Sequence, residues 1–452
     1  MKNTVGFVCF GEVNTPFHRL QEKHDRAVQS LKSLDIDLID AGIVIDDPQY
    51  ETADMAQDIL KRKEMSALIV CVAGWVPTHA VIYTIDPFRA MPVLLWGLCG
   101  AVEQGKIVTT AEQAGTTAIR PVLEAMDYRF KFIYNVIGKP EPLDEIQAFL
   151  RAAFAVQRLR RARIGSMGYR DMLLYGTQYE GLSLRGQIGP EVEPFEMLEM
   201  LQRMKHITQD QISAAIQNFC GDWHIQKACD KAVLEKGVHY ALALAEKIKE
   251  RGWDAITLID VDGMKKLLGY PPAIVFMLLE RLCSVCTIPE NDVMGNVTQL
   301  MARYVTGQTA HYMEYYEFFE RSLLIGVPDY VPVTAVKDQV ELLPTAFGLL
   351  DEALLNVSKV KTGYVTCVRL YYKKGRYYLH MYTGEACPPP AWEEFGWAPP
   401  APQLPSLEVF PDSCTVEEFA QKVSGQHVIV CYGNFRKEFR ELCRMLDITM
   451  VE

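Results

Sequence analysis

Apolar runs of strand length alternate with helical patterns of apolar residues in the N-terminal part of the chain. The run at 67–72, Ala-Leu-Ile-Val-Cys-Val, is continuously apolar, as expected of a strand buried on both faces of a parallel sheet. Strands that alternate with helices predict a doubly wound parallel sheet. The predicted strands are 4–10, 36–45, 67–72, 92–98 and 130–136, and the predicted helices are 18–34, 52–63 and 116–126.

The same alternation resumes after a long connecting helix predicted at 143–163. A second parallel sheet is predicted from strands that begin at 163, 255 and 285, and the stretch 172–188 is expected to be a loop with strand pieces. The predicted helices are 196–205, 209–219, 231–251, 272–282 and 294–305.

The pattern changes after about residue 324. Strands at 363–370 and 375–382 alternate with a period of two and predict a hairpin. The proline-rich stretch 387–405 predicts a loop. A short helix at 416–422, a strand within 424–433 and a helix at 437–446 follow. The fold class is therefore α/β, with two doubly wound parallel-sheet domains (1–162 and 163–303) and a mainly antiparallel β-rich domain (304–452).

Composition and charge exclude some classes of protein. The chain has 452 residues and a net charge of −11, which disfavours nucleic-acid binding. No apolar run is long enough to span a membrane, and the first residues resemble a strand rather than a signal peptide. The 12 cysteines are scattered, as expected of reduced thiols in a cytoplasmic protein.

Acidic residues follow adjacent predicted strands of the second domain. Asp260 and Asp262 come after the strand at 255–259, and Glu290 and Asp292 come after the strand at 285–288. Charged residues in an apolar setting are rarely buried unless they are paired or bind a metal. These positions favour a cation site. The alternative is a polar loop with a helix cap, because Asn and Asp are common caps.

The first domain offers candidate ligand contacts at its own strand ends. Ligands of parallel sheets bind beyond the carboxyl ends of the strands, which here indicates Asn14 and Trp75. Trp75 is a wall for a small polar ligand or a side chain buried between sheet and helix. No Gly-x-Gly-x-x-Gly follows the first strand, so dinucleotide binding is disfavoured.

Two segments resemble the L-fucose isomerase and L-arabinose isomerase family. Glu290-Asn291-Asp292, a helix rich in Met and Leu, Thr306-Gly307 and an acid at 314 are similar to the family's central metal motif. Ser-Gly-Gln426-His427 before an apolar strand is similar to the C-terminal motif that supplies a metal-binding His. By itself, a lone His at that position is usually structural.

The resemblance implies an aldose–ketose isomerase that uses Mn²⁺ and acts on an open-chain sugar through a cis-enediol. It implies that Glu290, Glu314 and His427 are the metal ligands and that both glutamates are the acid/base pair, without saying which is the base. Two carboxylates and an imidazole suit such a hard divalent ion. Gln426 and Asp260 are candidates for contacts with the sugar. The L-fucose branch usually has Asp at position 314, which leaves the substrate open.

The family's active site is usually completed by a neighbouring subunit. The resemblance therefore implies a homo-oligomer in which Asn14, His18 and Trp75 serve a neighbour's metal. An alternative substrate is an anionic sugar, because the fold's relatives include isomerases that convert sulfoquinovose to 6-deoxy-6-sulfofructose. A sulfonate needs cationic partners, for which His18, Arg19 and Arg170 are candidates. A second alternative is a non-catalytic sugar-binding protein.

Overall fold

The computed structural model describes residues 3–327, 330–345, 353–390 and 405–452. The chain forms two compact units. The first contains Met1–Gln157 and Lys437–Leu446, and the second contains Arg158–Arg436 and Asp447–Glu452. The division into three domains that the sequence predicts stays a prediction.

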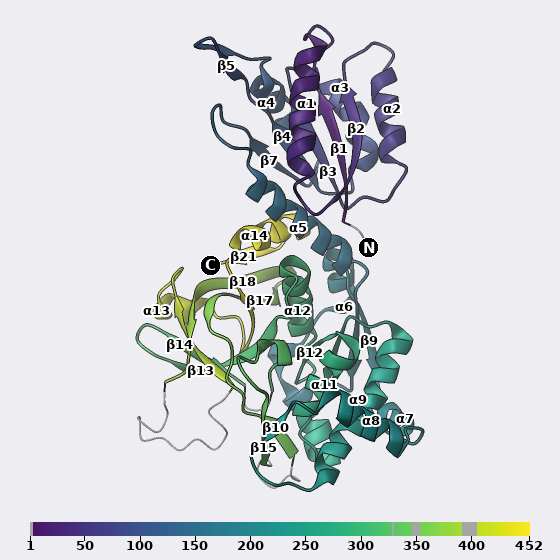
Figure 1. Ribbon diagram of the computed structural model, residues 1–452, viewed down its shortest axis with the longest axis vertical. Coiled ribbons are helices and arrows are strands. Elements are labelled where there is room, and N and C mark those ends of the chain that lie inside the picture. The colour runs from purple at the N-terminus through teal and green to yellow at the C-terminus, as the bar shows by residue number, and fades with distance from the viewer. Residues whose placement is uncertain (1–2, 328–329, 346–352, 391–404) are drawn as a thin grey trace. The chain divides into compact units, whose positions relative to one another are not determined.

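The first unit is built on a parallel five-stranded sheet, which confirms the predicted arrangement (Figure 1). Its central strands are fully buried, which explains their continuous apolar runs. The strand order is β2 (Asp37–Val44), β1 (Thr4–Phe10), β3 (Ala67–Val72), β4 (Val93–Gly97) and β7 (Phe130–Tyr134). Its helices include α1 (Phe17–Leu31), α2 (Glu51–Leu60), α3 (Thr78–Ile85) and α4 (Glu112–Ala125), and α5 (Leu143–Leu159) begins in this unit.

The last helix of the chain, α14 (Arg436–Leu446), packs with this unit through ion pairs. Glu441 is buried and its carboxylate lies 2.9 Å from the ammonium of Lys131 on β7. Lys437 pairs with Glu145 of α5 at 2.6 Å. Sequence periodicity predicts the helix but not its partner, because such pairing joins residues far apart in the chain.

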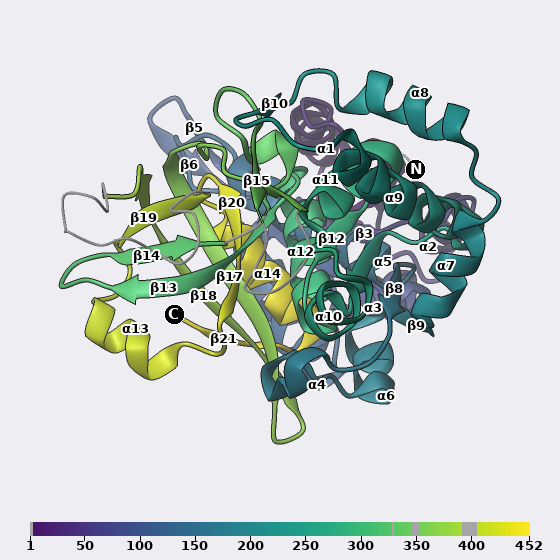
Figure 2. The ribbon, with the colours of Figure 1, turned by 90° about the horizontal axis from the view of Figure 1, so that it is seen from below.

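The second unit contains a parallel four-stranded sheet in the order β12 (Cys286–Ile288), β11 (Ala255–Leu258), β8 (Arg163–Met167), β9 (Glu191–Phe195). Its helices include α7 (Met197–Met204), α8 (Gln209–Phe219), α9 (Lys231–Arg251), α11 (Ala273–Cys283) and α12 (Val293–Thr306), and α7, α8 and α9 lie on the right of Figure 2. The parallel sheet was predicted, whereas β9 was not.

The same unit contains an antiparallel sheet that closes on itself, because β17 (Gly363–Lys373) pairs with both β18 (Arg376–Cys387) and β20 (His427–Tyr432). The ring continues from β20 through β13 (His311–Phe318), β14 (Leu323–Gly326) and β19 (Ser406–Pro411) back to β18. β21 (Thr449–Val451) adds in parallel to β18. The predicted hairpin and helix α13 (Val416–Lys422) are confirmed. Short strands β10 (His224–Ile225), β15 (Glu341–Thr345) and β16 (Ala353–Asn356) form a further sheet.

The stretch 172–188 differs from the prediction. It forms short helical turns between Asp171 and Ile188 instead of strand pieces. The buried Asp171 carboxylate accepts hydrogen bonds from the N–H groups of Val261 and Asp262, at 2.8 and 2.7 Å. This long-range contact holds the start of the stretch. Most of the proline-rich stretch 387–405 lies outside the described residues. Among the helices that the structure describes, none has the length and apolar character needed to cross a membrane.

His24 makes the stability of the first unit depend on pH. This buried residue of α1 contacts Asp40 of β2 at 3.0 Å and Asp25 at 2.9 Å. The hydrogen bond with Asp40 raises the pKa of His24 to about 9. Because the pKa of a folded-state histidine is raised, the stabilisation is complete below the unfolded pKa, about 6.5, and is lost as the pH rises through about 9.

We therefore expect His24→Gln to destabilise the protein by about 1–3 kcal/mol at pH 6 and by much less at pH 9.5. Urea unfolding of both proteins at the two pH values measures this difference. His79→Gln is the control, because no ion pair of His79 is seen among the described residues of the unit. An equal effect of His24→Gln at both pH values would contradict the prediction.

Candidate metal centre

The connection between β12 and α12 places Glu290 in a strained backbone conformation. Glu290 has φ +60° and Asn291 has φ +51°, in the left-handed region that costs a non-glycine residue about 1–3 kcal/mol. Hydrogen bonds hold both residues there. The Glu290 N–H donates to Asp260 Oδ1 at 2.6 Å, and the Asn291 N–H donates to the Leu258 carbonyl at 2.9 Å. Strain held in this way often marks a functional site.

The Asn291 side chain extends this framework to β8 and the residues after it. Its Oδ1 accepts a hydrogen bond from the Ser166 hydroxyl at 2.6 Å, and its Nδ2 donates to the Tyr169 carbonyl at 2.6 Å. Asn291 is buried, and these contacts satisfy its amide. The residue next to Glu290 is therefore fixed by side-chain as well as backbone contacts.

Asp292 caps α12, because its Oδ1 accepts a hydrogen bond from the Gly295 N–H at 2.9 Å. A Cβ atom at Gly295 would lie 2.5 Å from Asp292 Oδ2 and 2.1 Å from Ile288 Cδ1. Glycine at 295 thus permits the close approach of helix, cap and strand. The predicted cap is confirmed, but it is one of several roles of this carboxylate.

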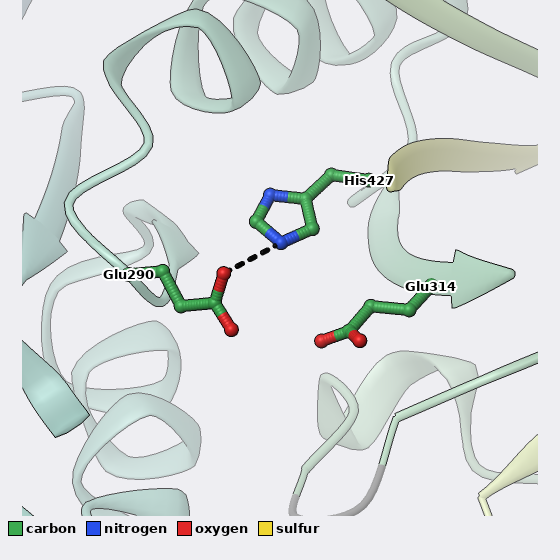
Figure 3. A group of neighbouring side chains, drawn as sticks. All are labelled: Glu290, Glu314 and His427. Atoms are coloured by element: carbon green, nitrogen blue, oxygen red, sulfur yellow. Dashed lines mark ion pairs between the residues drawn. The ribbon is translucent and has the colours of Figure 1, made fainter. Parts of the chain in front are cut away.

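Glu314 and His427 are brought together by strand pairing. They are directly opposite each other on β13 and β20, whereas they are far apart in the sequence. Glu290 reaches the same point from its loop. Figure 3 shows the three side chains pointing toward one another, and one ligand atom from each lies within 4.8 Å of the others. Nε2 of His427 is 2.9 Å from Oε2 of Glu290.

The donor set fits a hard divalent cation. Two carboxylates and an imidazole converge at a site where Glu290 and His427 are buried and Glu314 is half-buried. Carboxylate and imidazole ligands suit ions such as Mn²⁺, although they do not specify which ion. The predicted set of Glu290, Glu314 and His427 is thus a possible metal-binding group in the structure.

Two further charged residues, Asp292 and Arg369, lie on the Nδ1 side of the His427 ring. Its Nδ1 lies 2.7 Å from Asp292 Oδ2, and Asp292 forms an ion pair with Arg369 of β17. Burial alone would lower the pKa of His427, but hydrogen bonds with Asp292 and Glu290 outweigh it and raise this pKa to about 9. Burial alone would raise the pKa of Asp292, but Arg369 and His427 hold it well below its usual range.

Two more side chains contact the ligand group directly. Gln426 Nε2 donates to Glu290 Oε2 at 2.9 Å and lies 3.0 Å from His427 Nε2. The Tyr312 hydroxyl donates to Glu314 Oε1, and its ring stands edge-on to that of His427 at 4.8 Å. Sequence reasoning included Gln426 but missed Tyr312. The period of two along β13, which places Tyr312 on the same face as Glu314, is the signal for it.

The predicted contact residues outside this group have other partners. Asp260 accepts the Glu290 N–H and pairs with Lys265 at 3.2 Å. In the first unit, Arg19 forms a two-pronged ion pair with Glu103, and the Asn14 amide donates to Glu12. His18 is exposed and the Trp75 side chain is 40% exposed. Contact of Asn14, His18, Arg19, Trp75 and Asp260 with a sugar stays a prediction.

Comparison with known proteins does not place the chain in a family. No protein-family model matches it, and no curated protein matches it significantly. The function is therefore argued from the site itself.

We expect Glu290→Gln, Glu314→Gln and His427→Gln each to weaken Mn²⁺ binding by more than about 100-fold, beyond the usual effect of an outer-shell change. Each substitution removes one donor from the converging group. Titration of metal-free protein with Mn²⁺ in a calorimeter measures the affinity. Glu317→Gln, on the exposed part of β13, is the matched control. Binding that survives all three substitutions would place the ion elsewhere.

Proposed function

We propose that the protein is a metal-dependent aldose–ketose isomerase that acts on an open-chain sugar. The observation that supports this most is the convergence of Glu290, Glu314 and His427, whose donor atoms lie within 4.8 Å of one another. They would hold a divalent ion such as Mn²⁺. When bound, this ion would polarise the sugar carbonyl and acidify the neighbouring hydroxyl.

The two glutamates supply the proton transfers of the proposed reaction. A carboxylate takes the proton from C2 of the aldose while O1 gains a proton, which gives a cis-enediol. A proton is then delivered to C1 while the hydroxyl on C2 loses its proton, which gives the ketose. Glu290 and Glu314 approach the site from a loop and a strand, so they reach it from different elements. The Tyr312 hydroxyl donates to Glu314 and helps to set the orientation of its carboxylate.

Positioning of the sugar is assigned to Gln426. Its amide contacts Glu290 Oε2, so it lies beside the ligand atoms and can instead donate to a sugar hydroxyl. Subunits that complete one another's sites, with Asn14, His18 and Trp75 as contacts, belong to the same proposal.

An anionic sugar such as sulfoquinovose is a second candidate substrate, and one observation favours it. Arg170 follows β8, just as Glu290 follows β12, so both extend from the same edge of the parallel sheet. Its guanidinium stacks over Tyr175 at 4.6 Å, and no ion pair is seen for it within the described part of the chain. Lys265, Lys266 and Arg369 pair with carboxylates. Arg170 is thus a cation that can take a sulfonate.

Turnover with Mn²⁺ tests the isomerase. We expect ketose formation from at least one of L-fucose, D-arabinose, L-arabinose, D-ribose, L-rhamnose and sulfoquinovose, and we expect EDTA to abolish it. Glu290→Gln and Glu314→Gln should lower kcat by about 10²–10⁴-fold, the usual contribution of general acid–base catalysis. Metal-free protein that binds a sugar without turning it over would favour a binding protein instead.

The Arg170→Gln variant distinguishes the substrate classes. If the substrate is anionic, we expect KM for sulfoquinovose to rise about 10–100-fold, because one charged hydrogen bond contributes about 1.5–3 kcal/mol. Arg170→Lys should recover part of this loss, and kcat should change little. Turnover of a neutral sugar by the same variant is the internal control. Turnover of neutral sugars alone by the unaltered protein would remove the second candidate.

A further inference from the structure

Three buried side chains form a continuous chain of contacts behind the ligand group. Arg369, Asp292 and His427 are 4%, 0% and 2% exposed. Both terminal nitrogens of Arg369 contact Asp292, with Nη2 at 3.0 Å from Oδ1. Asp292 Oδ2 is also 2.7 Å from His427 Nδ1. The three residues come from β17, the start of α12 and the start of β20.

Stability alone does not account for a buried ion pair at this position. Replacing such a pair with apolar residues of similar volume is often neutral or stabilising, because burying charges is costly. The cap of α12 requires only Oδ1 of Asp292, and asparagine caps helices equally well. The charge on Asp292 and the guanidinium that faces it therefore call for another explanation.

The contact between Asp292 and His427 determines how the imidazole can bind a metal. An ionised carboxylate only accepts hydrogen bonds, so the proton between these residues belongs to His427 Nδ1. The lone pair available to a metal is then on Nε2, which is the nitrogen 2.9 Å from Glu290 Oε2. Metal-bound histidines are commonly oriented by such a carboxylate.

We infer that Arg369 and Asp292 are positioning residues of the metal centre: Arg369 fixes the Asp292 carboxylate, which in turn directs His427 Nε2 toward Glu290 and Glu314. The inference rests on the metal-binding part of the proposed function. The two terminal nitrogens of Arg369 donate to both carboxylate oxygens of Asp292, and Nη2 also donates to the Gly176 carbonyl at 3.2 Å. Arg369 is further held because the N–H of Leu370 donates to Thr298 of α12 at 3.1 Å.

The charges at the site allow an effect of Arg369 on the orientation of His427 to be separated from an effect of its charge on the cation. Glu290, Glu314 and Asp292 are acidic and Arg369 is basic, so a divalent ion balances the group when His427 is neutral. If Arg369 acted only through its charge, removing it would strengthen binding of a cation. Removing Arg369 and Asp292 together leaves the balance unchanged, so any loss of affinity then reflects orientation.

The test measures Mn²⁺ affinity by competition with a fluorescent chelator. We expect the double variant Arg369→Met/Asp292→Asn and the single variant Asp292→Asn to bind Mn²⁺ about 10–100-fold more weakly than the unaltered protein. The Mn²⁺ affinity of Arg369→Lys should lie between that of the unaltered protein and that of the double variant. Lysine keeps the positive charge but cannot contact both carboxylate oxygens of Asp292 at once. Arg281→Met/Asp222→Asn is the matched control. It removes another two-pronged pair of the same unit and should leave the affinity unchanged.

Nitrogen NMR gives a readout that a merely structural role would not move. In protein with ¹⁵N-labelled histidine and loaded with Zn²⁺, we expect His427 to carry its proton on Nδ1 and the metal on Nε2. Asp292→Asn should shift the Nδ1–H resonance. The reverse arrangement in the unaltered protein would overturn the inference. So would a cooperatively folded double variant that binds Mn²⁺ as tightly as the unaltered protein.

Failure of the proposed function has a separate signature. If the unaltered protein takes up neither Mn²⁺ nor Zn²⁺, the isomerase proposal fails, and so does the inference that Arg369 and Asp292 position a metal ligand. If metal binds and depends on Arg369 and Asp292 but no sugar is turned over, the positioning inference stands and the isomerase proposal fails.

Discussion

The carboxylate of Asp292 joins three parts of the second unit. One oxygen caps α12, and the pair of oxygens receives Arg369 from β17 and His427 from β20. Because the residue is fully buried, each of these contacts forms where water does not compete. A single side chain therefore connects the loop that carries Glu290 to the closed sheet that carries Glu314 and His427. The geometry of the candidate metal centre depends on this connection.

Strain and strand register set the remaining geometry. Glu290 and Asn291 adopt left-handed backbone conformations that only their surroundings stabilise, chiefly Asp260 and the carbonyl of Leu258. Glu314 and His427 need no such strain, because antiparallel pairing places them opposite each other. Glu290 is thus positioned by a strained loop that its neighbours hold in place. Glu314 and His427 are positioned by regular antiparallel pairing of β13 and β20. Both devices fix the three side chains of the candidate metal centre relative to one another.

The chemistry of the site follows from the imbalance of its charges. The carboxylates of Glu290 and Glu314 converge with His427, and the carboxylate of Asp292 lies on the other side of that ring. Arg369 contacts Asp292, and His427 contacts both Asp292 and Glu290. A buried excess of negative charge is costly unless a cation compensates it. A divalent ion would do so, and in the proposed isomerisation it would also polarise the sugar carbonyl.

The sequence by itself determined the local elements and part of the site. Continuous apolar runs indicated buried parallel strands, as at 67–72, and the acids after them indicated a cation site near Glu290. The resemblance added Glu314 and His427, which the structure places beside Glu290. Tertiary structure alone decided what supports them. The ion pair of Arg369 with Asp292 and the closure of β17 on β20 depend on contacts between residues distant in the chain, which periodicity does not encode. Tyr312 is different, because it lies two residues from Glu314 on one strand and the period of two indicates it. The pairing of α14 with the first unit, like the ion pair of Arg369, joins residues distant in the chain.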